Sequence, residues 1–463
     1  MSPQSSPSLG VTKELCSWIH GLRLDDVPES VRTRAKYLIL DGLCCALLGA
    51  HLPWVEKAAN AIFAIEPPGN SVVWGYDKKL GPLPAALLNS TEIQSFELDD
   101  WHMLAPLHSN SILLPPLLAA ASQKKSNGSP ALDGAAFLLS TIVGYETGPR
   151  VGLCLYGGHM LTRGWHSGTT FGHAAAAAAV SKLLDLPKDV IEDALGIACT
   201  QASRIRSAQR TVRRSDGRGG YIGIKNVFEE PYGGFLSTFG QNSGKEPPYL
   251  VNELTKGLGQ TWQSDNIRVK SHASMAGTHC TIDAVAKLQK KHPEKLADLR
   301  TIASIKIEMS EAAFKHGGWK AERPLSALGA QMSCAYVAAV QLVDGQVLPQ
   351  DFHQDLLDRD VLWALVDKTE CFHTPELGEK YEQRVTLAFE DGEVITQTLA
   401  APLDVAPGLS NEEILEKFRR FTKGIVDDWR RDEIERLVLD IENIGDITDL
   451  EGLLAGRTAN PIE

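Results

Sequence analysis

The chain has 463 residues, more than one compact core usually serves, so two domains are expected. Its composition, 43% hydrophobic and 22% charged, is that of an ordinary globular protein. The formal net charge of -12 argues against nucleic acid and anionic membrane surfaces as partners. An anionic small substrate is compatible with this charge, because local groups decide how such a molecule binds.

The cysteines and the N-terminus indicate the cellular compartment. The eight cysteines form no Cys-x-x-Cys pair, so they indicate neither a zinc site nor a disulfide framework. The first residues are polar and lack the basic residues of a signal or transit peptide. No apolar run reaches the ~18 residues that a membrane helix needs. We therefore expect a cytoplasmic protein with reduced thiols and no membrane partner.

In the first half of the sequence, segment after segment carries apolar residues at helical spacing. The predicted helices cover residues 31–48, 112–121, 134–143, 171–184 and 188–202. Short polar joints separate them, and this favours a helical bundle in which several helices are largely buried.

The pattern changes near residue 262. Residues 302–309 alternate apolar and polar side chains, which predicts a strand. Residues 385–389 and 394–398 flank an Asp-Gly turn and predict a hairpin. Helices are expected at 282–289 and 335–343, and residues 411–440 return to amphipathic helix.

These elements predict a mainly α protein with two domains. Residues 1–262 and 402–463 are expected to form a large helical-bundle domain built from both chain ends. Residues 263–401 are expected to form an inserted, smaller α+β domain.

The densest group of reactive side chains comprises Glu97, Asp99, Asp100, His102 and His108. Carboxylates and imidazoles are costly to bury unless they pair or do chemistry. A carboxylate held beside a histidine raises the imidazole pKa and keeps it available as an acid near neutral pH. A solvated loop with helix-capping carboxylates would give the same pattern.

Three further features carry candidate residues. His166 precedes an alanine-rich helix, whose free backbone N–H groups favour anions; a plain capping histidine is the alternative. Six arginines, Arg213 among them, lie between 204 and 218 and could bind carboxylates, or could simply belong to an exposed, turn-rich loop. Lys270 and His279 precede the predicted helix at 282–289, and Trp319 lies in a glycine-rich loop.

Several stretches together resemble the MmgE/PrpD superfamily, and within it the cis-aconitate decarboxylases of filamentous fungi. The resemblance runs over essentially the whole chain. The matching stretches are residues 35–42, 97–100, 105–109, 164–166, 192–202, 232–236 and 331–333. Long blocks of this kind make the family assignment specific.

The resemblance implies a homodimer, an inserted lid, no metal and no organic cofactor. It also implies a site between the two domains. His108 and His166 match two histidines of the family's first domain, and His279 matches a histidine of its lid. Glu97 stands where many relatives carry an aspartate. Trp319 lies in the lid segment that holds an active-site tyrosine in some relatives.

The sequence departs from the family pattern soon after residues 207–209. Arg213 takes the place of a lysine that belongs to the site of the fungal decarboxylases, and part of the following segment is missing. Arginine still binds a carboxylate, but its pKa stays above ~12, so it is a poor proton donor. One alternative is therefore a catalytically impaired dimer that only binds a small acid or a partner protein.

The function that we predict is cofactor-independent decarboxylation of cis-aconitate, a small tricarboxylate, to itaconate. Either His108 or His166 would donate the proton. The other predicted catalytic residues are Glu97, Asp99 and Asp100. The predicted substrate-binding residues are His102, Lys270, His279, Arg213 and Trp319. A hydro-lyase acting on a methylcitrate-like or alkylcitrate-like acid is the second alternative.

Overall fold

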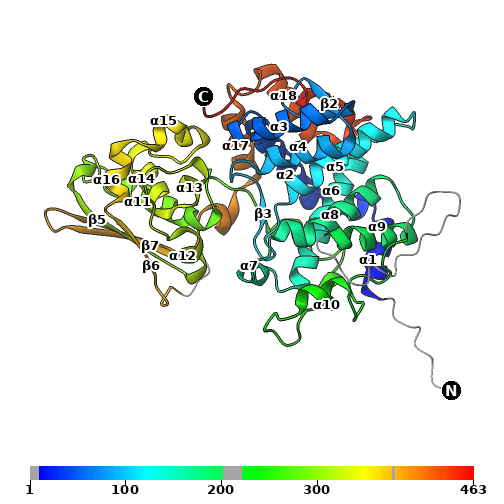
Figure 1. Cartoon of the computed structure of the whole chain (residues 1–463), viewed down its shortest axis with the longest axis horizontal. Coiled ribbons are helices and arrows are strands. Elements are labelled where there is room, and N and C mark those ends of the chain that lie inside the picture. The colour runs from blue at the N-terminus through cyan, green and yellow to red at the C-terminus, as the bar shows by residue number, and fades with distance from the viewer. Residues whose placement is uncertain (1–9, 202–221, 378–380) are drawn as a thin grey trace.

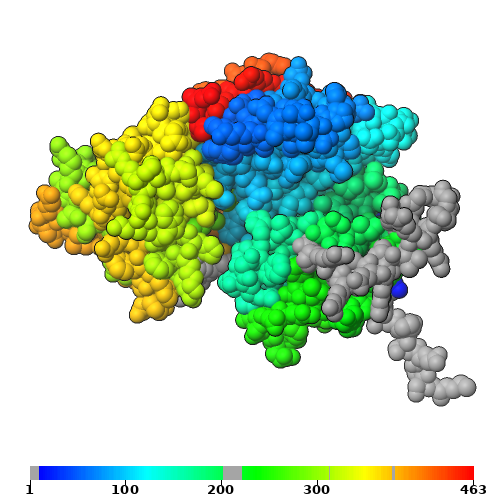
Figure 2. Space-filling view, in the orientation of Figure 1, coloured from blue at the N-terminus to red at the C-terminus, as the bar shows by residue number. Residues whose placement is uncertain are grey.

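The computed structural model describes residues 10–201, 222–377 and 381–463. Within these ranges the chain is mainly helical with a small mixed sheet toward its C-terminal end, so the predicted fold class is confirmed at that level. Figure 1 shows helices α1–α10 on one side together with α17 and α18, and helices α11–α16 with the sheet on the other. Figure 2 shows the surface hollowed where these two parts meet. The arginines at 204–218, including Arg213, lie outside the described residues.

The first part of the chain forms the helices that its apolar spacing predicts. Their ends are shifted by five residues or fewer, except that the helix predicted at 134–143 continues to residue 154. The predicted segments correspond to α2, α5, α6, α8 and α9. The helices are α1 (Val11–Gly21), α2 (Glu29–Gly49), α3 (Pro53–Ile65), α4 (Pro82–Gln94), α5 (Ser109–Ser126), α6 (Gly134–Cys154), α7 (His159–Thr162), α8 (Ser167–Leu183), α9 (Lys188–Gln201) and α10 (Phe235–Gly240).

The expectation of helices alone in this first part is wrong at two places. β1 (Pro68–Val73) and β2 (Lys78–Leu80) form an antiparallel pair between α3 and α4. β3 (Trp101–His102) pairs antiparallel with β4 (Ile267–Arg268), far away in the sequence. β2, β3 and β4 have two or three residues, too few for an alternating pattern, and β1 begins with Pro-Gly-Asn-Ser, which is typical of a turn.

A row of glycines on α6 lets the segment that leads into α5 approach closely. Gly144, Gly148 and Gly152 lie four residues apart, on one face of the helix. A Cβ atom at these positions would lie 2.3 Å, 2.4 Å and 2.8 Å from side-chain atoms of Leu113, Leu107 and Ala105. Larger residues on this face would push the segment before α5 away from the bundle.

The second part is built on a four-stranded mixed sheet in the order β6-β5-β7-β8. Its strands are β5 (Ile302–Met309), β6 (Thr369–His373), β7 (Gln383–Phe389) and β8 (Val394–Leu399). β5 runs parallel to β6 and antiparallel to β7, and β7 and β8 form the predicted hairpin. Helices α11 and α14 pack on this sheet. The helices here are α11 (His279–Lys291), α12 (Glu311–Gly317), α13 (Ala327–Met332), α14 (Cys334–Asp344), α15 (Gln354–Leu357) and α16 (Asp360–Val366).

The C-terminal helices return to the first part. α17 (Asn411–Thr422) and α18 (Asp428–Leu439) pack on α2, and α19 (Thr448–Leu454) packs on α5. Residues Gln263–Asn266 contact α2 and α6 just before β4 joins β3. The limits of the inserted domain, 263 and 401, stay a prediction. Within the described residues no single helix is long and apolar enough to cross a membrane, although the bent pair α2 and α3 passes that test by length and composition.

A buried ion pair fastens α17 to α2. Lys417 Nζ lies 2.6 Å from Asp41 Oδ1 and donates a hydrogen bond to Leu98 O at 2.9 Å. Burial alone would lower the pKa of Lys417, but the charge of Asp41 outweighs this effect and raises that pKa above its ordinary value. Lys417 therefore stays charged, and its hydrogen bond to Leu98 O attaches the backbone of that segment to α17.

Replacing Lys417 by methionine leaves Asp41 buried without its cation. Removing one partner of a buried pair costs about 3–5 kcal/mol, so the Lys417→Met variant should lose that much free energy of unfolding in a urea titration. The Lys423→Met variant changes an exposed lysine just after α17 and should unfold like the wild type. Equal unfolding midpoints for the two variants would contradict a structural role for this ion pair.

Candidate active site

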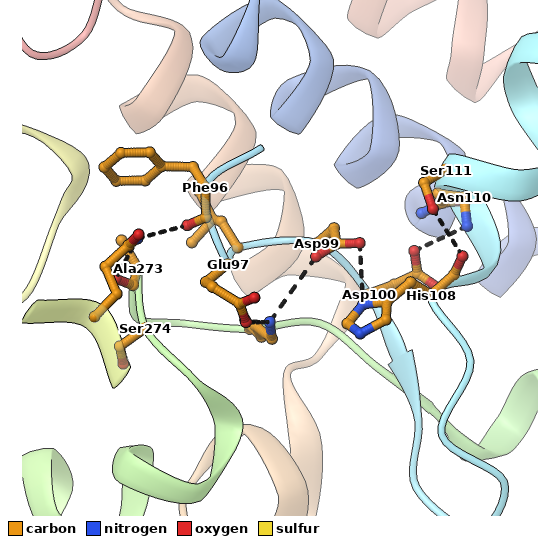
Figure 3. Close-up of polar contacts among 12 residues, drawn as sticks. Phe96, Glu97, Asp99, Asp100, His108, Asn110, Ser111, Ala273 and Ser274 are labelled. Atoms are coloured by element: carbon orange, nitrogen blue, oxygen red, sulfur yellow. Dashed lines mark hydrogen bonds and ion pairs between the residues drawn. The ribbon is translucent and has the colours of Figure 1, made fainter. Parts of the chain in front are cut away.

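The site is centred on the acidic loop, residues 97–100, which connects α4 to β3. Glu97 has a left-handed backbone conformation with φ 52°, which is unusual for a residue other than glycine. This conformation turns the chain sharply just before two buried carboxyl groups, Asp99 and Asp100. Figure 3 shows Glu97, Asp99 and His108 next to one another.

Asp99 and His108 form a buried ion pair. Asp99 Oδ2 lies 3.0 Å from His108 Nδ1, and the side chains are 0% and 21% exposed. Burial opposes the charge of both groups, but each charge more than compensates for the burial of the other. The pKa of Asp99 is lowered and the pKa of His108 is raised. The pairing therefore favours the carboxylate form of Asp99 and the imidazolium form of His108, whose Nε2 is left to donate a proton.

Lys270, just beyond β4, brings a second cation to the acidic loop. Its Nζ lies 3.0 Å from Glu97 Oε2 and 3.9 Å from Asp99 Oδ1. The charge of Lys270 lowers the pKa of Glu97. Burial alone would lower the pKa of Lys270, but Glu97 and Asp99 outweigh it and raise that pKa. Two carboxylates and two cations thus alternate through the site.

Asp100 points to the start of α5 instead of toward a histidine. Its two oxygens accept hydrogen bonds from the backbone N–H groups of Ser109 and Asn110, both at 3.0 Å. Burial, followed by the charge of Asp99, raises the pKa of Asp100 to about 7. A carboxyl group here satisfies two otherwise unpaired N–H groups of the helix. Because His108 immediately precedes α5, Asp100 also fixes the position of that histidine.

A cavity of about 650 Å³ is lined by Glu97, His108 and Lys270 together with residues from both parts of the fold. The helical part contributes an apolar wall, and the part with the sheet contributes the facing side. The apolar and aromatic lining residues include Trp101, Leu104, Tyr156, Leu161, Met275 and Tyr381. The charged groups are therefore gathered at one place in a largely apolar cavity, as in many small-molecule sites.

His166 lies near His108 but is not among the residues that line this cavity. His166 lies directly before α8, as His108 lies directly before α5, and its ring is partly exposed to solvent and partly covered by the protein. Burial and then the charge of His108 lower the pKa of His166, so the two imidazoles are electrostatically coupled. Near neutral pH His166 is therefore mainly neutral, and its pKa is shifted in the opposite direction to that of His108.

Asp99 and Asp100 lie behind the cavity lining, and three predicted substrate-binding residues also lie outside it. His279 is buried in α11, with Nδ1 2.6 Å from Asp404 Oδ2 and Nε2 3.0 Å from Ser274 O. His102 is buried in β3, and its Nδ1 accepts a hydrogen bond from the Ala105 N–H. Trp319 is partly exposed on the loop after α12. The substrate-binding roles of these three residues stay predictions.

Several polar cavity residues were not among the predicted site residues. His159 belongs to α7, close to His166 in the sequence, and its Nε2 lies 2.8 Å from Ser243 O. His316 in α12 lies three residues before the predicted Trp319. Tyr156 and Tyr381 also line the cavity. Only the glycine-rich surroundings of His159 and His316 could have drawn attention to them in the sequence.

The site can donate a proton from His108 and bind a carboxylate through Lys270. Among the described residues no cluster of three or more His, Cys, Asp or Glu side chains is placed to hold a metal ion.

The chain is similar to known proteins over nearly all of its length. Residues 13–216 match the MmgE/PrpD N-terminal domain and residues 272–442 match the MmgE/PrpD C-terminal domain. The chain is 45% identical to a cis-aconitate decarboxylase-like protein of Aspergillus oryzae, over 98% of this chain and 99% of that protein. It is 42% identical to the cis-aconitate decarboxylase of Aspergillus terreus, over 100% of this chain and 99% of that protein. A more distant match, 22% identical over 89% of this chain and 84% of that protein, is the mitochondrial 2-methylcitrate dehydratase of Yarrowia lipolytica.

The Asp99→Asn variant should shift the pH profile of turnover at this site. Asparagine keeps the shape of Asp99 but removes the charge that raises the pKa of His108. The imidazolium then loses its proton at lower pH, so kcat should begin to fall at lower pH than in the wild type. Asp133→Asn, at the cap of α6, is the matched control and should leave the profile unchanged. An unaltered profile in Asp99→Asn would mean that Asp99 does not control His108.

Proposed function

Because the chain belongs to the MmgE/PrpD family, we propose that it decarboxylates cis-aconitate to itaconate, with His108 as the proton donor. The relatives named as cis-aconitate decarboxylases, at 42% identity, support this substrate. The observation that carries the proposal is the pairing of His108 with a buried carboxylate, Asp99, at the wall of the cavity. The relatives alone would not select this residue.

The reaction needs one proton and releases one molecule of CO2. When the carboxylate on the CH2 carbon of cis-aconitate leaves as CO2, the electron pair of the broken C–C bond forms a new C=C bond. The electrons of the former double bond move to its outer CH carbon, the imidazolium of His108 protonates that carbon and becomes neutral, and solvent then returns the proton to His108. General acid catalysis of this kind contributes roughly 10²–10⁴-fold to the rate. Asp99 stabilises the charged form of His108 before the transfer.

The two histidines suit different tasks. The pKa of His108 is raised and the pKa of His166 is lowered, so His108 holds its proton to higher pH than His166 does. Only a protonated group can act as the acid, which favours His108. Lys270, kept charged by Glu97 and Asp99, is suited to bind a substrate carboxylate that stays on the product.

The apolar wall of the cavity favours a second candidate. Trp101, Leu104 and Leu161 offer no partner to a carboxylate, but they fit an apolar substituent on the substrate. A hydro-lyase acting on an alkylcitrate-like acid would use this wall. The distant relative named as a 2-methylcitrate dehydratase supports that alternative.

Incubation of the purified protein with cis-aconitate should yield itaconate and an equal amount of CO2. Dehydration of 2-methylcitrate without any itaconate would replace the decarboxylase proposal by the hydro-lyase. No change in either acid, with binding of cis-aconitate in a calorimeter, would indicate a catalytically silent relative.

The His108→Gln variant should lower kcat by about 10²–10⁴-fold, because glutamine removes the general acid while its side chain fills a similar volume. His51→Gln is the matched control. His51 is another buried histidine that pairs with a carboxylate, the partly exposed Glu56 at 2.8 Å, but it does not line the cavity. The control should keep the kcat of the wild type. Similar losses in both variants would indicate a general effect on folding, and no loss in His108→Gln would exclude this residue as the acid.

A further inference from the structure

The acidic loop contains a backbone conformation that needs support from outside. The left-handed φ of Glu97 costs energy for a residue with a Cβ atom, and such a conformation persists only where its surroundings enforce it. The peptide groups on either side of Glu97 are where that support must act, because they set its φ and ψ.

Two carbonyl groups near Glu97 are held by buried side chains from distant parts of the chain. One belongs to the peptide just before Glu97, and the other, Leu98 O, lies one peptide beyond the one that follows Glu97. Phe96 O accepts a hydrogen bond from Gln331 Nε2 at 2.9 Å. Leu98 O accepts one from Lys417 Nζ at 2.9 Å. Gln331 and Lys417 are 1% and 7% exposed. The two donors come from α13 and α17, so opposite parts of the fold hold the backbone on the two sides of Glu97, directly before it and one residue after it.

Gln331 makes a second connection with the same amide group. Its Nε2 also donates to Ala273 O at 3.0 Å, three residues after Lys270. Its backbone carbonyl accepts a hydrogen bond from the Met275 N–H at 3.1 Å. Figure 3 shows Phe96 and Ala273 facing each other on the two segments that carry Glu97 and Lys270. One amide nitrogen therefore joins these segments directly.

We propose that Gln331 is a positioning residue that sets the distance between Glu97 and Lys270 by binding the Phe96 and Ala273 carbonyls together. In this role Gln331 touches no substrate itself. The effect that we expect on turnover rests on the proposed function. Glutamine suits this task because its amide offers two hydrogens from one nitrogen. Methionine fills the same volume without a donor, and asparagine is one methylene shorter.

The distance matters because Lys270 is buried and depends on its neighbours for its charge. The groups that face it are Glu97 and Asp99 in the acidic loop, with Cys45 from α2 also contributing. His108 lies on the far side of Asp99. If the two segments separate, Lys270 loses the partner at 3.0 Å and becomes easier to deprotonate. It then holds a substrate carboxylate less well.

The test compares Gln331→Met with Gln341→Met. Gln341 is a buried glutamine of α14 whose amide bonds to Gln289 at 2.9 Å, away from the cavity. In Gln331→Met the KM for cis-aconitate should rise by about tenfold, the loss expected when a charge-assisted hydrogen bond is weakened, whereas kcat should change much less because His108 keeps Asp99. Gln341→Met should keep both constants.

A second measurement does not require turnover. Acetic anhydride acetylates only the neutral amine, so the rate at Lys270 reports how readily it loses its proton. Peptide mass spectrometry, with exposed Lys315 as the internal standard, should find faster acetylation of Lys270 in Gln331→Met and an unchanged rate in Gln341→Met. If the wild type makes no itaconate, the proposed function fails, and the acetylation rate still decides the role of Gln331.

Gln331→Asn covers the case in which the methionine variant does not fold. Its shorter amide cannot reach both carbonyls, so Lys270 should again be acetylated faster than in the wild type. Wild-type acetylation rates in the folded Gln331 variants, or a loss of thermal stability with unchanged KM and acetylation rate, would overturn the proposal.

Discussion

A carboxylate with no exposed surface keeps its charge only if cations stand beside it, and this constraint on Asp99 organises the site. His108 supplies one positive charge at 3.0 Å, and Lys270 supplies another at 3.9 Å. Each cation is itself buried or half-buried and needs the carboxylate in return. Glu97 completes the group by pairing with Lys270. Removing any member therefore changes the protonation of the others, which makes the cluster one electrostatic unit.

The rest of the fold serves to hold this unit at the wall of the cavity. The glycine face of α6 admits the segment that leads to His108, and Asp100 fixes the first turn of α5. Lys417 ties the acidic loop to the C-terminal helices, and the β3–β4 pair brings Lys270 next to that loop. The last two contacts join segments that lie far apart in the sequence, 319 residues in the case of Lys417 and Leu98. The site thus depends on the return of the C-terminal helices to the first part.

The sequence was most informative where the deciding interactions are local. Helical spacing predicted α2, α5, α6, α8 and α9, and an Asp-Gly turn predicted the β7–β8 hairpin, because both signals lie within a few residues. Glu97, Asp99 and His108 could be selected together because they fall within one short segment. The charge state of Lys270 could not be predicted, since its partner Glu97 lies 173 residues away.

Burial and hydrogen bonding of the other predicted residues depend on packing that no local pattern contains. Both ring nitrogens of His279 are occupied inside the protein, by Asp404 and Ser274. The buried position of His102 likewise follows from the pairing of β3 with β4. The sequence shows that a residue is a histidine and can exchange protons. It does not show whether the ring nitrogens are free to contact a substrate or are bonded inside the protein. Gln331 drew attention only as part of a family motif, although its amide reaches both halves of the site.

The central claim is that a buried Asp99 keeps His108 protonated at the cavity. An NMR titration of protein labelled with 13C at its histidine rings, with His108 assigned by the His108→Gln variant, measures this most directly. The account predicts a pKa for His108 above 6.5, the ordinary value for histidine. A pKa at or below that value in the wild-type protein would contradict it.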